Sequence, residues 1–313
     1  MITSSIETAA RLLRAGKVVA FPTETVYGLG ALAYDAQAIA RIFEVKGRPR
    51  FDPLIVHAEN AVRAFELCEG SSILASRLAE AFWPGPLTLV LPKRSSIPDI
   101  VTAGLPSVAI RVPAHPIALK LLSLVGSPLA APSANRFGRI SPTTSAHVHD
   151  DLGSDVPLIL EGGPCGKGVE STILSLLEAR PRLLRPGSVS LEDMTAVVGD
   201  IDVSNEYSER PQSPGQLRSH YAPHTKMERL RDATRPPPGE RVGLLAIRPI
   251  AAKGYAAVEV LSPSGDLQEA AANLFSALRR LDVLQLDRIV CEFAPARGIG
   301  LAINDRLSRG CQR

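Results

Sequence analysis

The sequence predicts a two-domain α/β protein, and three observations support this fold class. Short apolar runs typical of buried strands alternate with stretches at helical spacing, which favours a mixed α/β sheet over an all-helical or sandwich fold. The chain has 313 residues, which is more than one ordinary domain uses. The alternation stops near Asp200 and resumes at Arg241, beyond a polar, proline-rich stretch. We therefore expect a domain over residues 1–200, a linker over 201–225 and a small α/β domain over 226–313.

Caps and apolar spacing predict the helices of the first domain. Ser5 is a suitable N-cap for a helix through Ala15, which Gly16 would end. Asp35 caps a second helix that reaches Lys46. Further helices are expected at 72–82, at 115–124 and after Ser190.

Apolar runs between these helices predict the strands. In the first domain they lie at 18–21, 54–56, 87–91, 108–112, 128–131, 158–160, 172–176 and 182–184. In the second domain, strands are expected at 242–247, 257–261 and 288–292, with helices at 267–281 and 301–309.

Composition limits the possible classes of function. With 45% hydrophobic residues the chain can bury a large core, and a net charge of +3 without any long basic run permits RNA contact but does not argue for it. The four cysteines are widely separated and support neither a disulfide framework nor a zinc site. We find no stretch apolar enough to span a bilayer and no signal peptide, so we expect a cytoplasmic protein without membrane contact.

The segment Lys46–His57, KGRPRFDPLIVH, carries the strongest chemical signal. It places Lys46, Arg48 and Arg50 on a turn stiffened by glycine and proline, just before an apolar strand that ends in His57. Three cations on a fixed turn repel one another unless an anion lies among them. The turn therefore indicates a polyphosphate or nucleotide site, with a solvated basic loop as the alternative.

Common catalytic motifs are missing. There is no P-loop, no GxGxxG after a strand, no HExxH and no GxSxG. His220 and His224 have helical spacing, but Pro223 between them disfavours a metal-bearing helix. Cys165 has no evident base partner and is not expected to be a nucleophile.

Hydroxyl, amide and cationic side chains instead gather where strands meet loops. Ligands of open α/β sheets bind beyond strand ends, so these side chains would share one crevice. From the residues alone, the interpretation is an anion- or nucleotide-binding α/β enzyme. Ordinary turn residues, a solvated sheet face for Arg111 and a core histidine for His57 are the alternatives. The residues concerned are Thr23, Thr25, Lys46, Arg48, His57, Arg111, Ser133, Asn135, Ser141, Glu170, Ser171, Thr172 and Arg185.

Several segments together resemble a known family. The chain contains, in order, PTETVYGLG, KGRPRFDPLIVH, WPGPLTLVL, VAIRVP, APSANRFGRISPT, GGPCGKGVESTI and LLRPGS. In this order they resemble the YrdC-like threonylcarbamoyl-AMP synthases, and SPGQLRSHYAPHT and GIGLAINDRL resemble the linker and appended domain of the family's two-domain form. The resemblance covers nearly the whole chain. It implies a twisted mixed β-sheet with a concave basic cavity, plus a small Rossmann-like domain.

The resemblance also implies a reaction, in which L-threonine, bicarbonate and ATP give threonylcarbamoyl-AMP and pyrophosphate. The product would pass to a separate transferase that forms threonylcarbamoyladenosine in tRNA. Mg²⁺ would accompany ATP, with no metal ligand assigned in the protein. Lys46 and Arg48 would be catalytic. The implied ATP contacts are Lys46, Arg48, Asp52, Ser107, Ser133, Asn135, Ser141, Arg185 and, reaching over the nucleotide from the linker, Tyr221. The implied threonine contacts are Thr25, His57, Arg111, Ala131 and Ser171.

Two positions depart from the family's usual pattern. The family commonly has Asn where Asp52 stands and Thr where Ser107 stands. Ser107 keeps the hydroxyl, whereas Asp52 adds a negative charge near a polyphosphate. The alternative function is an RNA-binding maturation module of the same fold, without synthase activity, and weak contact with tRNA is compatible with either function.

Overall fold

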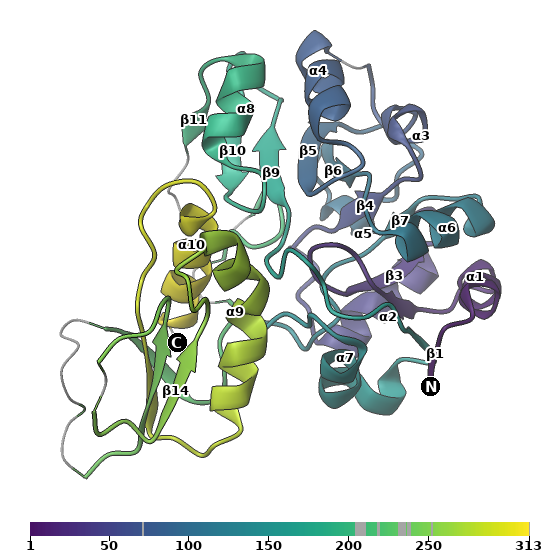
Figure 1. Cartoon of the computed structure of the whole chain (residues 1–313). Coiled ribbons are helices and arrows are strands. Elements are labelled where there is room, and N and C mark those ends of the chain that lie inside the picture. The colour runs from purple at the N-terminus through teal and green to yellow at the C-terminus, as the bar shows by residue number, and fades with distance from the viewer. Residues whose placement is uncertain are drawn as a thin grey trace.

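The computed structural model describes residues 1–70, 72–203, 211–217, 220–230, 236, 239–251 and 253–312, which form two sheets in two parts of the chain (Figure 1). The first sheet is mixed and twisted, with parallel and antiparallel neighbours. Its strands, in spatial order, are β1 (Ile2–Thr3), β8 (Ile159–Leu160), β2 (Val19–Phe21), β3 (Gly28–Leu32), β7 (Leu129–Ala130), β4 (Ile55–His57), β6 (Ser107–Arg111), β5 (Leu87–Pro92), β9 (Thr172–Ser175), β10 (Arg182–Arg185) and β11 (Asp202–Val203).

The helices of the first domain cover both faces of this sheet near β2. Side chains alternate along β2, so Val19 and Phe21 pack with α1 and α6, while Ala20 joins the core that includes α2, α4 and α8. Ser5 and Asp35 cap α1 and α2 as expected. The helices are α1 (Ile6–Arg14), α2 (Ala36–Lys46), α3 (Ala61–Phe65), α4 (Ile73–Phe82), α5 (Asp99–Thr102), α6 (Pro116–Val125), α7 (Ser145–Leu152) and α8 (Leu191–Val198), with a 3₁₀ turn at Gly153–Asp155.

The sheet face that α1 and α6 cover continues across the central strands. There it carries a small apolar cluster of Ile55, Val90, Ala109, Ile173 and Leu184. Functional side chains of the central strands project from this face, as described below.

The second domain is a four-stranded sheet whose strands are all parallel. In spatial order it contains β12 (Lys226–Arg229), β15 (Arg288–Cys291), β13 (Val242–Ala246) and β14 (Ala257–Val260). Helices α9 (Leu267–Asp282) and α10 (Gly300–Gly310) lie between this sheet and the first domain (Figure 1). This arrangement confirms the α/β class expected for both domains.

The two domains pack closely through backbone as well as side chains. Gly168 has φ +68° and lies so near α9 that a Cβ would come within 2.4 Å of the Ala271 carbonyl oxygen. An apolar cluster joins Val169 of the first domain to Phe275 of α9. The Arg279 guanidinium also donates to the Asp151 carboxylate at 2.6–2.9 Å.

Most expected elements are confirmed to within a few residues, and some of the unpredicted ones have a physical reason. Strand β3 reads GLGAL, in which two glycines suggest a loop, yet a Cβ at Gly30 would come within 2.7 Å of the Phe21 ring. Strands β1 and β11 have two residues each, too few to show a period. The helices α3, α5 and α7 and the strand β12 were also not expected from the pattern.

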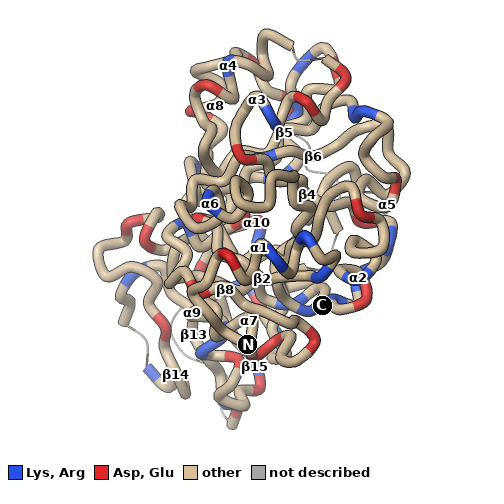
Figure 2. Tube along the Cα trace, turned by 90° about the vertical axis from the view of Figure 1, so that its right-hand side faces the viewer, with Lys and Arg blue, Asp and Glu red and all other residues tan. Residues whose placement is uncertain are grey.

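Charges of both signs are interspersed along the described part of the trace (Figure 2). None of the helices formed by the described residues is both long enough and apolar enough to cross a membrane.

Candidate active site

A hollow lies where loops from both ends of the central strands meet the linker. The hollow is lined by Thr23, Thr25, Val26, Tyr27, Gly28, Arg48, Ile55, His57, Arg111, Ala131, Pro132, Ser133, Glu170, Ser171, Arg185, Pro214, Gly215, His220 and Tyr221.

His57 and Arg111 form one wall and are neighbours by strand register. They are paired residues of the parallel strands β4 and β6, and they project from the same face as Ile55 and Ala109. Burial, and then the charge of Arg111, lowers the pKa of His57 to about 3, so its imidazole is neutral at physiological pH. Arg111 itself is buried, which excludes the solvated sheet face considered above.

Arg111 is held by partners on two sides. Its Nη1 donates to Thr25 Oγ1 at 2.9 Å and its Nε to the Gly85 carbonyl at 3.2 Å. Its Nη2 forms an ion pair with Glu24. The charge of Arg111 is therefore balanced, while Thr25 is fixed with its hydroxyl in the hollow.

The turn after α2 separates the three cations of the KGRPR segment. The helix ends at Lys46 because Gly47 adopts the left-handed conformation, φ +61°. Lys46 is buried and its Nζ donates to the backbone carbonyls of Ser133, at 2.6 Å, and Asn135. Arg48 is buried beside the hollow, whereas Arg50 is exposed. The expectation that all three cations share one anion seat is therefore wrong for Arg50.

Asp52 lies behind Arg48 and not in the hollow. The Arg48 Nη2 forms an ion pair with Asp52 Oδ2 at 2.9 Å, and its Nε donates to the Asp52 carbonyl. Both side chains are almost fully buried. Asp52 thus acts as the counter-ion of Arg48 in this structure.

The loop after β7 supplies Ser133 and is braced from within. Asn135 Nδ2 donates to the carbonyls of Arg136 and Arg139, which closes the loop on itself. Ser141, further along, donates to Glu170. Ser133 and Ala131 line the hollow, whereas Asn135 and Ser141 hold its wall from behind.

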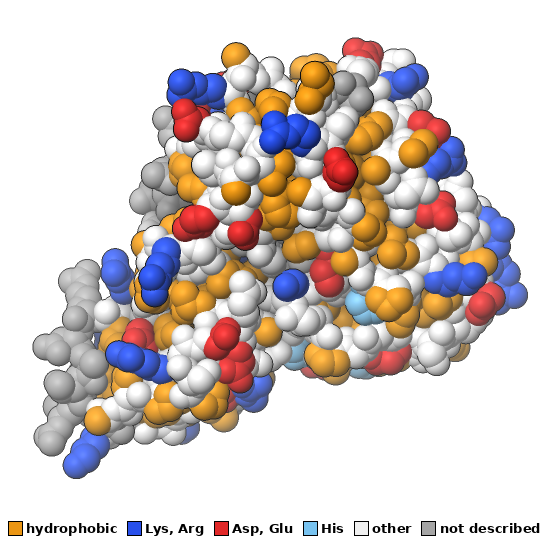
Figure 3. All heavy atoms as spheres, turned by 45° about the horizontal axis from the view of Figure 1, so that its top comes forward, with side chains coloured by type: hydrophobic (Ala, Val, Ile, Leu, Met, Phe, Trp, Pro, Cys, Tyr) orange, Lys and Arg blue, Asp and Glu red, His pale blue; other side chains and the backbone are white. Residues whose placement is uncertain are grey.

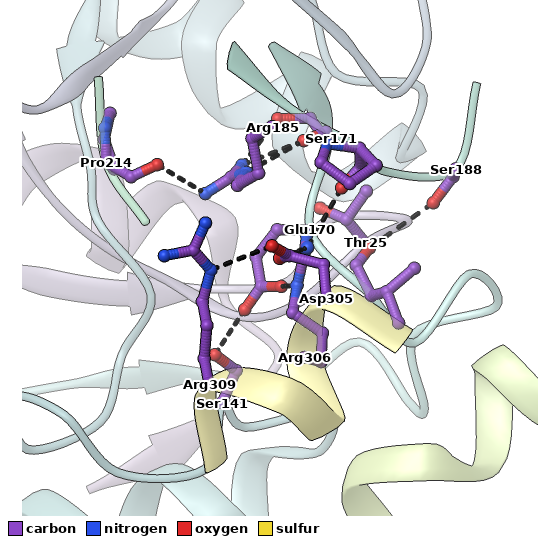
Figure 4. Close-up of polar contacts among 12 residues, drawn as sticks. Thr25, Ser141, Glu170, Ser171, Arg185, Ser188, Pro214, Asp305, Arg306 and Arg309 are labelled. Atoms are coloured by element: carbon purple, nitrogen blue, oxygen red, sulfur yellow. Dashed lines mark hydrogen bonds and ion pairs between the residues drawn. The ribbon is translucent and has the colours of Figure 1, made fainter. Parts of the chain in front are cut away.

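Arg185, at the end of β10, is fixed by neutral oxygens. Its Nε and Nη2 donate to the Ser171 carbonyl at 3.2 and 2.9 Å, and its Nη1 to the Pro214 carbonyl at 3.2 Å (Figure 4). The Ser171 hydroxyl shares a 2.7 Å hydrogen bond with Thr88. Arg185 thus connects the sheet to the linker at Pro214.

The charges around the hollow do not cancel. Several groups are neutral overall: Arg48 is paired with Asp52 and Arg111 with Glu24, while Arg306 and Arg309 of α10 share the carboxylates of Glu170 and Asp305. Within the described ranges, no carboxylate lies within ion-pair distance of Lys46 or Arg185. A buried cation without a counter-ion is unfavourable, and burial together with Arg48 lowers the pKa of Lys46 well below its ordinary value. The site is therefore prepared for an anion.

The structure brings together most of the residues singled out from the sequence. Ser107 does not line the hollow; it starts β6, on the far side of Ala109 from Arg111. Glu170 lines the hollow, as expected of the residues that share the crevice, whereas Tyr27 and His220 line it without having been placed there from the sequence. Tyr27 and His220 belong to segments with a recognisable motif, but nothing local shows that their side chains turn inward.

Tyr221 closes the hollow from the linker. It has φ +61°, its ring is buried and stacks on Phe275 with 5.8 Å between centroids, and His220 packs against it edge-on at 4.1 Å. The linker tyrosine is thus held by the second domain.

Two alternatives for nearby residues can be assessed. Burial raises the pKa of the Cys165 thiol to about 12, so it is not activated as a nucleophile. His220 lines the hollow while His224 is exposed, and no metal-ligand cluster occurs among the residues that are described.

Comparisons with known proteins show the family of this chain. A family model described as "Telomere recombination" matches residues 11–187, and one described as "Threonylcarbamoyl-AMP synthase, C-terminal domain" matches residues 189–311. Threonylcarbamoyl-AMP synthase of Pyrococcus abyssi is 43% identical over 97% of this chain and 93% of that protein. The crystal structure of P. abyssi Sua5 complexed with L-threonine superposes with a TM-score of 0.91 and 40% identity, covering 98% of this chain and 94% of that chain.

A shorter relative also occurs. A putative threonylcarbamoyl-AMP synthase of Mycobacterium tuberculosis is 37% identical over 62% of this chain and 89% of that protein. The longer matches include both domains, and the fold agrees with them. This chain belongs to the threonylcarbamoyl-AMP synthase family, in its two-domain form.

Proposed function

We propose that this chain is a nucleotidyltransferase that converts L-threonine, bicarbonate and ATP into threonylcarbamoyl-AMP, pyrophosphate and water. The observation that carries the proposal is a pair of buried cations with only neutral partners among the described residues: Arg185, which lines the hollow, and Lys46, which lies outside its lining and donates to the Ser133 carbonyl in its wall. A triphosphate is the anion that would balance them. Membership of the threonylcarbamoyl-AMP synthase family, and the wall of the hollow in which His57 is neutral and Arg111 is balanced by Glu24, support an amino acid as the second substrate.

For ATP, we assign the phosphates to Lys46, Arg48 and Arg185. Arginine forks match phosphate oxygens and lysine acts as a point charge. Ser133 would donate its hydroxyl to the nucleotide, and Tyr221 would cover it. Asn135 and Ser141 would act by holding the loop, and Asp52 by orienting Arg48. Because Ser107 does not line the hollow, it would contact ATP only if part of the nucleotide extended out of the hollow towards the start of β6.

For threonine, we assign the wall of Thr25, His57, Arg111, Ala131 and Ser171. Arg111 would bind the carboxylate, since its Nη groups already lie beside Thr25 in the hollow. The neutral His57 can donate or accept one hydrogen bond, which suits a hydroxyl group.

The proposed chemistry needs placement and charge balance more than a covalent nucleophile. The threonine amine adds to bicarbonate, water leaves, and a carbamate forms. A carbamate oxygen then attacks the α-phosphorus of ATP, the bond to the bridging oxygen breaks, and pyrophosphate leaves with its electrons. Lys46 and Arg185 would stabilise the negative charge that develops on the leaving group.

Mg²⁺ fits this site only as a companion of ATP. The carboxylates beside the hollow, Glu24, Asp52 and Glu170, are already paired with arginines, and the described residues contain no ligand cluster. Mg²⁺ binds oxygen and keeps several waters, so phosphate oxygens would hold it and it would neutralise their charge.

The product is a labile mixed anhydride, so we propose transfer to a separate enzyme that modifies tRNA in the cytoplasm. An RNA-binding function for the hollow is disfavoured by its burial. The cations Lys46, Arg48, Arg111 and Arg185 are at most 7% exposed, whereas RNA phosphates are contacted by exposed cations. On the face drawn in Figure 3, charges of both signs are mixed with apolar side chains.

The experiment that tests the proposal is a mass-spectrometric search for threonylcarbamoyl-AMP in a reaction with all three substrates and Mg²⁺. Pyrophosphate should be released only when threonine, bicarbonate and ATP are all present. Release without threonine, or salt-dependent tRNA binding without any adduct, would contradict the proposal.

A further inference from the structure

One side chain of the second domain reaches the wall of the hollow. Arg306, on α10, is the largest fully buried side chain among the described residues, and its Nε donates to Glu170 Oε2 at 2.7 Å. Its Nη1 donates to the Pro186 carbonyl at 2.9 Å and to Asp305 Oδ2 at 2.6 Å, and Arg309 Nε is a second partner of Asp305 at 2.9 Å. The Arg306 guanidinium lies 5.1 Å from the centre of the Tyr221 ring. Arg306 therefore touches three separate segments that form the site.

The contact of Arg306 with Glu170 affects the charges of the hollow. Glu170 lines the hollow and faces Ser141, Tyr221, Arg185 and Arg306. In Figure 4, Arg306 extends from α10 to Glu170, while Arg185 lies on the other side of that carboxylate. A buried carboxylate beside two arginines pairs with whichever is nearer and better aligned.

The position of Arg306 decides which arginine is left for a substrate. Glu170 is bonded to Arg306, so among the described residues the hydrogen-bond partners of Arg185 are the Ser171 carbonyl and hydroxyl and the Pro214 carbonyl. Without Arg306, Glu170 would keep its charge in the wall and would pair with Arg185 across the hollow. The site would then lose Arg185 as an unbalanced cation.

We propose that Arg306 is a positioning residue for the nucleotide site: by neutralising Glu170 it keeps Arg185 available for phosphate, and it holds the Tyr221 ring against the site. The second domain thus completes the charge arrangement of the first. This inference deepens the proposed function. Its test by pyrophosphate release rests on that function, whereas its test by ATP binding does not.

The test compares Arg306→Met with a matched docking control, Arg279→Met. Arg279 also joins the domains by an ion pair, with Asp151, but contacts no residue that lines the hollow. The dissociation constant for ATP is measured by calorimetry, and kcat/KM for ATP by pyrophosphate release. We expect Arg306→Met to weaken ATP binding and lower kcat/KM by about 10–100-fold. Arg279→Met should change both by less than about threefold, even if its unfolding temperature falls.

A second variant tests whether Arg306 acts by neutralising Glu170 or only by packing in the domain interface. Arg306→Met/Glu170→Gln removes the unpaired carboxylate and should recover at least about threefold in ATP affinity over the single variant. Burial raises the pKa of Glu170, and Arg306 and Arg185 outweigh this, so the pKa lies below its ordinary value. Arg306→Met should therefore raise that pKa and add an inflection to the pH dependence of ATP binding, which the double variant lacks.

Each outcome decides the question. Equal losses in Arg306→Met and Arg279→Met, no loss in Arg306→Met, or no recovery in the double variant would overturn the positioning role. If Arg306→Met does not fold, Arg306→Lys keeps the charge but not the forked contacts and should show an intermediate ATP affinity; wild-type affinity in that variant would also overturn it. Failure of the wild-type chain to make threonylcarbamoyl-AMP would contradict the proposed function but leave the ATP-binding comparison intact.

Discussion

Replacing Lys46 by methionine tests the charge balance of the hollow most directly. Methionine has nearly the same length, so no cavity forms and the ammonium is what is lost. The change removes the cation whose neighbours in the described structure are carbonyl oxygens. For activity, the loss of an electrostatic contact to the leaving pyrophosphate should lower kcat/KM by about 10²–10³, or about 3–4 kcal/mol.

Without ATP, Lys46→Met should change the free energy of unfolding little, because a lost pair of hydrogen bonds and a removed buried charge have opposite effects. Leaving the Ser133 and Asn135 carbonyls without their donor costs about 1–3 kcal/mol each. Removing a buried ammonium without a counter-ion returns several kcal/mol of desolvation free energy. We therefore expect the free energy of unfolding of Lys46→Met to lie within about 2 kcal/mol of wild type.

The assay is urea unfolding with and without ATP, at a concentration 100 times the wild-type dissociation constant. ATP should stabilise wild type by about 2.7 kcal/mol. If the variant binds ATP about 100-fold more weakly, the same concentration stabilises it by only about 0.4 kcal/mol. Lys226→Met, an exposed lysine on β12, is the control and should match wild type in both measurements.

The titration of Lys46 should make wild-type folding stability rise with pH. The folded-state pKa of Lys46 lies below its unfolded value, so the unfolded chain binds more protons between the two and wild-type stability rises with pH there. Lys46→Met should lack this contribution, and its stability relative to wild type should fall as pH rises towards the ordinary lysine pKa. The reasoning fails if the variant loses more than about 5 kcal/mol in the free state, or if ATP stabilises it as much as wild type.

Three further predictions follow from the structure. The folded-state pKa of His57 is about 3 and the unfolded value is 6.5, so wild type loses about 2 kcal/mol of stability as pH falls from 7 to 5. His57→Gln should not show this loss in urea unfolding. Identical losses in the two proteins would contradict the prediction. Gly168→Ala should cost about 2–4 kcal/mol from positive φ and contact with α9, while the open Gly166→Ala should cost under about 1 kcal/mol; calorimetric unfolding distinguishes them. A fragment of residues 1–199 should keep the circular dichroism of a folded domain but lose pyrophosphate release, and full activity of the fragment would show that the linker and second domain are dispensable.

The sequence predicted best what local pattern controls. Asp35 and Gly47 define α2, and the end of that helix fixes where Lys46 lies. Arg111 lies in one expected strand and His57 directly follows another, and the register between β4 and β6 adds that the two residues are neighbours. The order of the motifs supplied the family, and the matches over residues 11–187 and 189–311 confirm it.

Contacts between distant segments could not be predicted in the same way. Glu170 and Arg306 are 136 residues apart, and neither has a local signal that names the other. Asp52 follows Arg48 by four residues, but whether it faces the ligand or the arginine depends on how Pro49 and Pro53 turn the loop. The charge balance of the hollow is thus a property of tertiary packing.

The reach of α10 into the first domain has an evolutionary consequence. The M. tuberculosis relative spans 62% of this chain and is too short to contain both domains. A protein without α10 has no Arg306, so a glutamate at the place of Glu170 would remain uncompensated unless another cation replaced the lost one. One-domain sequences should therefore carry a neutral residue there, or a basic residue gained nearby, and the gain or loss of the appended domain should be accompanied by a change at that single position.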